Sequence, residues 1–138
     1  MDRRALTGTI AVFVVWMAGS FLVHGVLLHA DYAQFPNLYR TEAETQALMP
    51  VLVLAHVLLA AAFTWIYARG AEAKAWIPQG LRYGLAVALL TVIPTYTITY
   101  VVQPLPVMMV VRQISFDTLL LLVLGLVIAY IYRNKRTA

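Results

Sequence analysis

The 138-residue chain contains no cysteine. Disulfide bonds, thiolate metal ligands and thiol redox chemistry are therefore excluded. Charge is also scarce, because Asp, Glu, Lys and Arg make up 12% of the residues, against about 25% in ordinary soluble domains. No zinc-protease H-E-x-x-H, no nucleophile elbow G-x-S-x-G and no acidic metal-binding cluster occurs in the sequence. A non-enzymatic role is favoured, although these absences do not decide whether the chain is an enzyme.

Long apolar stretches take up most of the sequence. The apolar fraction is 62% and the mean hydropathy is +0.81, well above the ~45–50% apolar usage of soluble domains. A membrane-spanning helix needs ~20 mainly apolar residues. The first stretch is too long for the ~7–15-residue core of a signal peptide, and no A-x-A site follows it. The sequence predicts one all-α domain over 1–138, a four-helix transmembrane bundle with helices at about 7–28, 48–69, 83–102 and 107–132 and an outer loop at 29–47.

The basic residues alternate between the gaps that separate these helices. Two of them, Arg40 and Arg112, fall on one side of the predicted membrane. The other eight fall on the opposite side: Arg3, Arg4, Arg69, Lys74, Arg82, Arg133, Lys135 and Arg136. Lys and Arg accumulate on the cytoplasmic side of membrane proteins, so both termini are predicted to be cytoplasmic in the cell inner (plasma) membrane. This bias explains the formal charge of +4 without nucleic acid as a partner, and the lipid bilayer is the expected surrounding.

Capping and proline residues refine the predicted ends of the helices. Thr41 and Glu44 have the spacing of a capping box, so a helix is expected to begin at Thr41. Pro50 should bend that helix near the outer surface. Residues 69–82 are predicted to form the inner loop. The prolines of 103–106 should end the third helix and begin the fourth.

Polar side chains inside a bilayer are costly, so each needs a partner or a function. At ~1.5 Å of rise per residue, all the candidates fall near the midplane or in the outer half of the bundle. Gln113, Asp117 and Gly125 share one face of the fourth helix, which is expected to point into the bundle. The candidates for binding a ligand or a proton are His24, His56, Thr95, Tyr96, Thr99, Arg112, Gln113 and Asp117.

Each candidate also has a structural alternative, in which a neighbouring helix satisfies it and Arg112 extends outward to the membrane surface. We expect Asp117, Gln113, His24, His56 and at least one of Thr95, Tyr96 and Thr99 to face a shared interior.

Three functions remain open from the residues. Asp117 and the histidines could form an outer polar pocket that binds or translocates a small ligand or a proton, because Asp and His are the usual protonation-coupled groups of low-dielectric sites. The chain could instead be an accessory or assembly subunit of a larger membrane complex, or a homo-oligomer. It could also hold haem b between His24 and His56, although their estimated depths differ by ~8 Å. Apart from haem, no cofactor or metal is indicated.

The order of the segments along the chain is similar to that of a known group of membrane proteins. The second helix ends in WIYARG, and the inner loop leads into GLRYGL before a proline-containing third helix. The fourth helix has an acid near its start and a glycine midway. In this order the chain resembles families of small four-helix inner-membrane proteins of bacteria that have no established activity. The resemblance implies the topology and no site residues.

Overall fold

The computed structural model describes residues 3–133 of the chain. All regular secondary structure in this range is helical. Four helical segments are long and apolar enough to cross a lipid bilayer: Arg3–Leu27, Met49–Gly70, Trp76–Val102 and Val107–Tyr132. The predicted all-helical fold is therefore confirmed, and the four segments fit a small multi-pass membrane protein. Lys135 and Arg136, which add to the predicted charge bias, lie outside the described residues.

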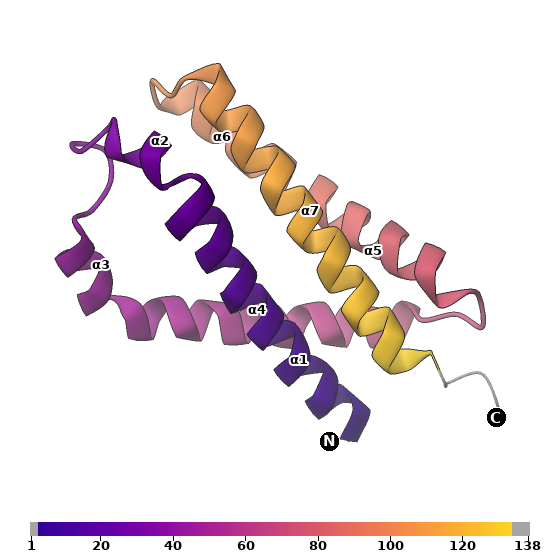
Figure 1. The fold of residues 1–138 in the computed structure, drawn as a ribbon. Helices are drawn as coiled ribbons and strands as arrows, with labels where there is room; N and C mark the ends of the chain where they lie inside the picture. Colours follow the sequence, from indigo (N-terminus) through magenta and orange to yellow (C-terminus); the bar gives the residue numbers. More distant parts are fainter. Residues whose placement is uncertain (1–2, 134–138) are drawn as a thin grey trace.

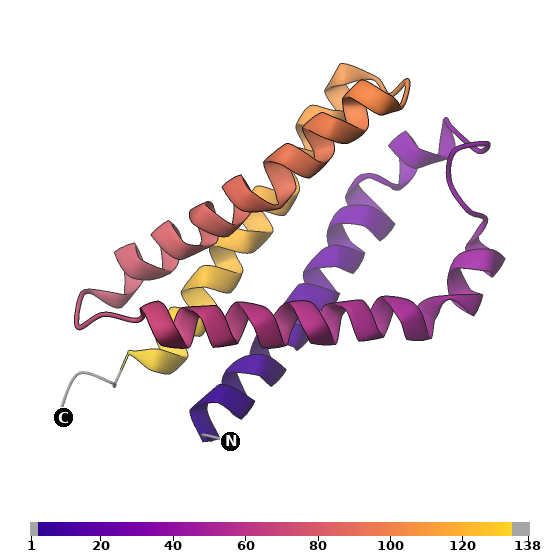
Figure 2. The same ribbon diagram turned by 180° about the vertical axis from the view of Figure 1, so that it is seen from behind.

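The four segments form an open bundle around one central helix. This helix is α7 (Val107–Tyr132), which packs against α5 (Trp76–Leu90) and α6 (Val92–Val102) on one side and α1 (Arg3–Ser20) on the other. The helix α4 (Met49–Gly70) packs mainly on α1 and is strongly inclined to the others (Figures 1 and 2). The second half of α4 contributes Ala60, Phe63 and Tyr67 to the core, whereas its first half is directed away from α7 (Figure 1).

The two ends of the bundle differ. The described termini and the connection at 71–75 lie at one end, which we call the terminal end (Figure 1). The 103–106 turn and the short helix α2 (His29–Ala33) lie at the other end, which we call the loop end. This arrangement places the start of α7 beside the chain that follows the first span.

The first span changes its helical form partway along. After Ser20, the segment η1 (Phe21–Leu27) continues as a π-helix, which has i→i+5 hydrogen bonds in place of the α-helical i→i+4 pattern. Helix α2 follows after a break at Leu28. The predicted helix at 7–28 is correct in position, but its last turns are not α-helical. Short π-helical segments of this kind are frequent at functional sites, and His24 lies in the middle of this one.

A short helix precedes the second span. In α3 (Glu42–Ala47), Thr41 Oγ1 accepts a hydrogen bond from the Glu44 backbone N–H at 3.3 Å, and the Glu44 carboxylate accepts one from the Thr41 N–H at 2.9 Å. The predicted capping box is confirmed. The predicted bend at Pro50 is instead a break at Leu48, because α4 begins at Met49 with Pro50 in its first turn. A missing backbone N–H is tolerated there.

The third span begins earlier than predicted. The sequence assigned 69–82 to a loop, but α5 starts at Trp76. Pro78 fits the first turn of a helix, so it does not prevent the earlier start. The span is divided at Thr91, whose φ of −117° and ψ of −67° separate α5 from α6. Pro94, four residues after Leu90, has no N–H to donate to the Leu90 carbonyl, which accounts for the break.

Helices α5 and α7 approach each other at glycines. A Cβ placed on Gly80 would lie 2.6 Å from the carbonyl oxygen of Gly125, and one placed on Gly84 or Gly125 would lie closer still to backbone of the facing helix. Gly80 and Gly84 form a G-x-x-x-G pair, which allows close backbone contact between membrane helices. This contact fixes α7 against the third span, and Gly125 faces the bundle as expected.

Candidate functional site

The site is centred on Asp117 of α7. Its Oδ2 accepts a hydrogen bond of 2.6 Å from the hydroxyl of Tyr96 on α6. Its Oδ1 lies 3.3 Å from Nε2 of His24 on η1. The Asp117 side chain is 13% exposed and the His24 side chain 34%. One carboxylate therefore contacts side chains from the first and the third span.

Tyr32 of α2 extends this set of contacts. Its hydroxyl lies 2.7 Å from His24 Nδ1 and accepts a hydrogen bond of 3.3 Å from Gln113 Nε2. Burial raises the pKa of Tyr32 to about 12, although the hydrogen bond from Gln113 acts in the opposite direction. Tyr32 is therefore a neutral phenol that can donate its proton to His24 Nδ1, which leaves Nε2 as the N–H that faces Asp117. We call Tyr96, Asp117, His24, Tyr32 and Gln113 the polar chain.

Local structure brings the polar chain together. Gln113 and Asp117 are four residues apart on α7, so both point to one face. The π-helical turns of η1 carry His24, and α2 carries Tyr32 back over the start of α7. Tyr96 comes from α6, just after the break in the third span. The residues that meet α7 thus lie in or next to irregular parts of their helices: the π-helix η1, the break at Leu28 and the break at Thr91.

A second set of contacts holds α2 and the following loop over the polar chain. Arg112 NH1 donates to both carboxylate oxygens of Asp31, at 2.9 and 3.0 Å. Arg112 thus has a partner in the loop while its side chain stays 51% exposed, as expected for a residue that extends outward. Beside this pair, three aromatic side chains from α2 and the following loop pack in one cluster: Tyr32, Phe35 and Tyr39. The cluster also contains Tyr96 of α6, Leu105 of the 103–106 turn, and Met109, Val110 and Ile114 of α7. Burial also raises the pKa of Tyr39. The loop therefore covers the loop end of α7.

Besides Arg112, three of the sequence-predicted residues lie outside the polar chain: His56, Thr95 and Thr99. His56 contacts the Leu52 carbonyl oxygen through Nδ1 at 2.9 Å and the Ser20 hydroxyl through Nε2 at 3.2 Å. Thr99 donates to the carbonyl oxygen of Thr95 at 2.8 Å, and the Thr95 side chain is exposed. His56 thus pairs with Ser20 of α1 from the inclined helix α4, and its hydrogen-bond partners differ from those of Asp117 and His24. Of the three α6 candidates, Tyr96 alone contacts Asp117.

The two histidines are not arranged around a common centre. His24 has Tyr32 and Asp117 at its two ring nitrogens, whereas His56 has Leu52 and Ser20. An iron held by both histidines would have to displace a contact at each ring. Within residues 3–133, no group of three or more His, Asp or Glu side chains is placed to hold a metal ion. The contacts of His24 and His56 give no support to a haem site.

The polar chain is built by direct pairing. Each of its five side chains has at least one of the others as a partner. Gln113 Oε1 is buried without a hydrogen-bond partner, so one acceptor remains unused. A cavity of about 50 Å³ lies at the opposite, terminal end, between α4, α5 and α7. Direct pairing between helices is the arrangement that the structural alternative predicts for these side chains.

Two residues of the site were not predicted from the sequence. Asp31 and Tyr32 were assigned to a loop outside the membrane, yet they contact Arg112, Gln113 and His24. The opposite charges of Asp31 and Arg112, both at the outer edge of the predicted bundle, were the available signal for the first. Tyr32 had no comparable signal, because its position depends on how the chain turns after η1.

Comparisons with known proteins leave the site to be interpreted from its own geometry. No family model, no curated protein and no solved structure matches this chain.

Proposed function

We propose that this chain is a multi-pass protein of the cell inner membrane with the terminal end in the cytoplasm. The proposal rests on charge, because Arg40 and Arg112 belong to the loop end whereas the terminal end carries six of the described cations: Arg3, Arg4, Arg69, Lys74, Arg82 and Arg133. Lys and Arg mark the cytoplasmic side of membrane proteins. The loop end, with the polar chain beneath it, then faces the outside.

Within this topology, the protein takes up and releases a proton at the Asp117–His24 pair. The observation that carries this role is the 3.3 Å contact between His24 Nε2 and Asp117 Oδ1 within a helical span. Ionisable groups inside a membrane are rare, and they mark proton relays and other functional sites. The hydroxyl of Tyr96 holds the second carboxylate oxygen at 2.6 Å, so the carboxylate is kept in one orientation.

Proton uptake would loosen the contacts between helices. Hydrogen bonds to an ionised carboxylate are about twice as strong as those between neutral groups. Protonation of Asp117 removes that charge and weakens its contacts with Tyr96 and His24, which connect α6 and η1 to α7. Proton binding would thus be coupled to the packing of the loop end.

The neighbouring ionisable groups do not compete with this pair. Asp31 and Arg112 neutralise each other above it. Tyr32 remains neutral because burial raises its pKa to about 12, and burial raises the pKa of Tyr39 as well. The unused acceptor Gln113 Oε1 offers a place where water could join the polar chain. Asp117 and His24 are therefore the pair in the polar chain to which we assign the proton.

Infrared difference spectroscopy of the protein in lipid bilayers tests this role. Spectra recorded at about pH 5 and about pH 8, the range in which imidazole usually titrates, should differ in carboxyl and imidazole bands. Asp117→Asn should remove the carboxyl band, and His24→Gln should remove the imidazole band. The matched controls are Glu42→Gln and His29→Gln, whose side chains are exposed. If Asp117→Asn leaves the difference spectrum unchanged, Asp117 does not exchange a proton in this range and the role is wrong.

A second candidate function is that of an accessory subunit or a homo-oligomer. From Met49 to Leu59, only Val53 and His56 of α4 are not exposed. This half of α4 offers an exposed apolar surface that a partner helix could cover. Cysteine substitutions at Val51 and Leu58, both exposed, should cross-link to the partner in native membranes. Absence of any cross-linked product would favour lipid as the neighbour of this surface.

A further inference from the structure

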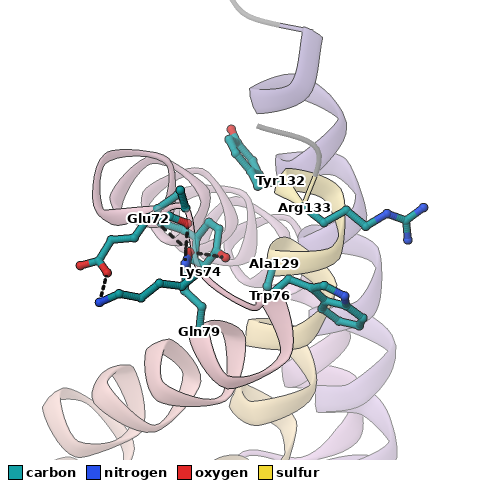
Figure 3. A pocket seen from close by; sticks show the side chains of 10 residues that line it. Glu72, Lys74, Trp76, Gln79, Ala129, Tyr132 and Arg133 are labelled. Carbon is teal, nitrogen blue, oxygen red and sulfur yellow. Dashed lines mark hydrogen bonds and ion pairs between the residues drawn. The ribbon is translucent and has the colours of Figure 1, made fainter. Parts of the chain in front are cut away.

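A cavity at the terminal end is independent of the polar chain. It lies between the end of α4, the connection at 71–75, the start of α5 and the end of α7, and has a volume of about 50 Å³. Its lining includes Lys74, Trp76, Gln79 and Arg133 (Figure 3). One water needs roughly 10–15 Å³ of such space, so the cavity can admit a group of several atoms.

The charges around this cavity are mostly positive. Lys74 forms an ion pair with Glu72, and both side chains are 59% exposed. The hydrogen bond from Lys74, its charge and, to a smaller extent, the charge of Arg82 lower the pKa of Glu72. Arg133 lies on another side of the cavity, with its guanidinium 3.5 Å from the centre of the Tyr130 ring. Two cations and one carboxylate therefore line the cavity.

The pair of Lys74 and Glu72 can exchange partners. Ion pairs between exposed side chains contribute little to stability, because water solvates both charges well. Lys74 can therefore turn from Glu72 to an anion in the cavity with little loss. Gln79 cannot do the same, because it accepts from the Tyr67 hydroxyl at 3.0 Å and donates to the Glu72 carbonyl at 2.9 Å. Lys74 and Arg133 are the lining cations that can bind an anion, and Arg133 would do so by turning from the Tyr130 ring, where its guanidinium points away from Lys74 in Figure 3.

The position of the cavity indicates where such an anion would come from. It lies where three of the apolar spans end, at Gly70, Trp76 and Tyr132. Trp76 packs edge-on against Tyr130 with 5.6 Å between ring centres, and aromatic side chains of this kind gather at the level of lipid headgroups. Ala71, Ala73 and Ala129 give the lining a small apolar part. Basic pockets between membrane helices at the cytoplasmic face bind anionic headgroups.

We propose that this cavity binds the phosphate of an anionic phospholipid through Lys74 and Arg133. The proposal requires that the four spans cross a bilayer, but it does not depend on proton binding by Asp117. Free phosphate offers the same chemistry, so the test must separate the two sources.

The test measures lipid retention by native mass spectrometry. The protein is purified from bilayers that contain phosphatidylcholine with a minor share of phosphatidylglycerol, and the fraction with bound phosphatidylglycerol is counted. Each cation near a membrane surface strengthens anionic lipid binding about fivefold. Lys74→Gln/Arg133→Gln should therefore lower retention by at least about fivefold. The matched control is Arg3→Gln/Arg69→Gln, which removes the same charge from the same end outside the cavity, and it should retain most of the lipid.

Three further outcomes decide the proposal. Equal losses in the two double variants would overturn it, because attraction to the general surface charge would then explain retention. Retention by Lys74→Arg would support it, because the charge is kept. Inorganic phosphate added to protein in phosphatidylcholine alone should not stabilise the fold against heating. If it does so as strongly as phosphatidylglycerol, the source is a soluble phosphate and the lipid proposal is wrong.

Discussion

The contact between α5 and α7 makes a quantitative prediction for Gly80→Ala. The added Cβ would lie 2.6 Å from the Gly125 oxygen and 2.9 Å from the Ala129 Cβ, whereas ordinary contact begins at 3.4 Å. The obstacle includes backbone of the facing helix, so α5 must move away by roughly 0.8 Å. A gap of ~0.5–1 Å already loses a quarter to a half of the dispersion energy of each contact. Overpacking of this kind costs about 1–3 kcal/mol.

The alanine also brings a small gain, since Ala favours a helix over Gly by about 0.5–1 kcal/mol. From the middle of both ranges, the expected net loss in unfolding free energy is about 1 kcal/mol, measured by reversible unfolding in mixed micelles with increasing dodecyl sulfate. Gly70→Ala is the matched control, because nothing lies within 4 Å of its added Cβ, and it should unfold like the unmodified chain. If Gly80→Ala is as stable as Gly70→Ala, close packing does not hold α5 to α7.

Two further predictions concern the topology and the capping box. The chain has no cysteine, so single introduced cysteines can be labelled without background. An impermeant thiol reagent added outside intact cells should label Gln34→Cys and Gln46→Cys but not Lys74→Cys. Labelling of Lys74→Cys would contradict the proposed orientation. The Thr41 N–H donates to the Glu44 carboxylate, and this is the main reason why the pKa of Glu44 is lowered in the folded chain. Glu44 therefore stabilises α3 fully above its unfolded pKa of about 4.3, and this stabilisation is lost as the pH falls through the lower folded pKa. Amide protection of 41–47 should therefore decrease in acid, whereas Thr41→Ala should show low protection already at neutral pH.

The sequence predicted the spans because apolar length alone determines them. The observed segments Met49–Gly70 and Val107–Tyr132 differ by one residue or less from the predicted bounds. The third span was placed seven residues late, because Pro78 and Arg82 made its first two turns look like a loop. Only the packing of Gly80 on α7 shows why these turns are helical. The G-x-x-x-G spacing of Gly80 and Gly84 was the signal for this contact.

The site was less predictable, because it depends on angles between helices. Helical spacing placed Gln113 and Asp117 on one face, and the cost of burying polar groups pointed to His24 and Tyr96. The same cost pointed equally to His56, and depth along a helix cannot show that α4 is inclined away from α7. The contribution of α2 could not be deduced either, since the break at Leu28 that turns Tyr32 toward His24 has no distinct sequence signal.

The π-helix η1 also determines which direction the chain after the first span faces. Each residue of an α-helix turns the chain by about 100°, whereas the wider i→i+5 turn of a π-helix takes about one more residue to complete. The seven residues of η1 therefore turn the chain less than seven α-helical residues would. If Phe21–Leu27 formed an ordinary α-helix, everything after it would be rotated by roughly the angle of one residue, and His24 and Tyr32 would no longer both meet α7. The helical form of η1 is therefore as much a part of the site as the side chains themselves.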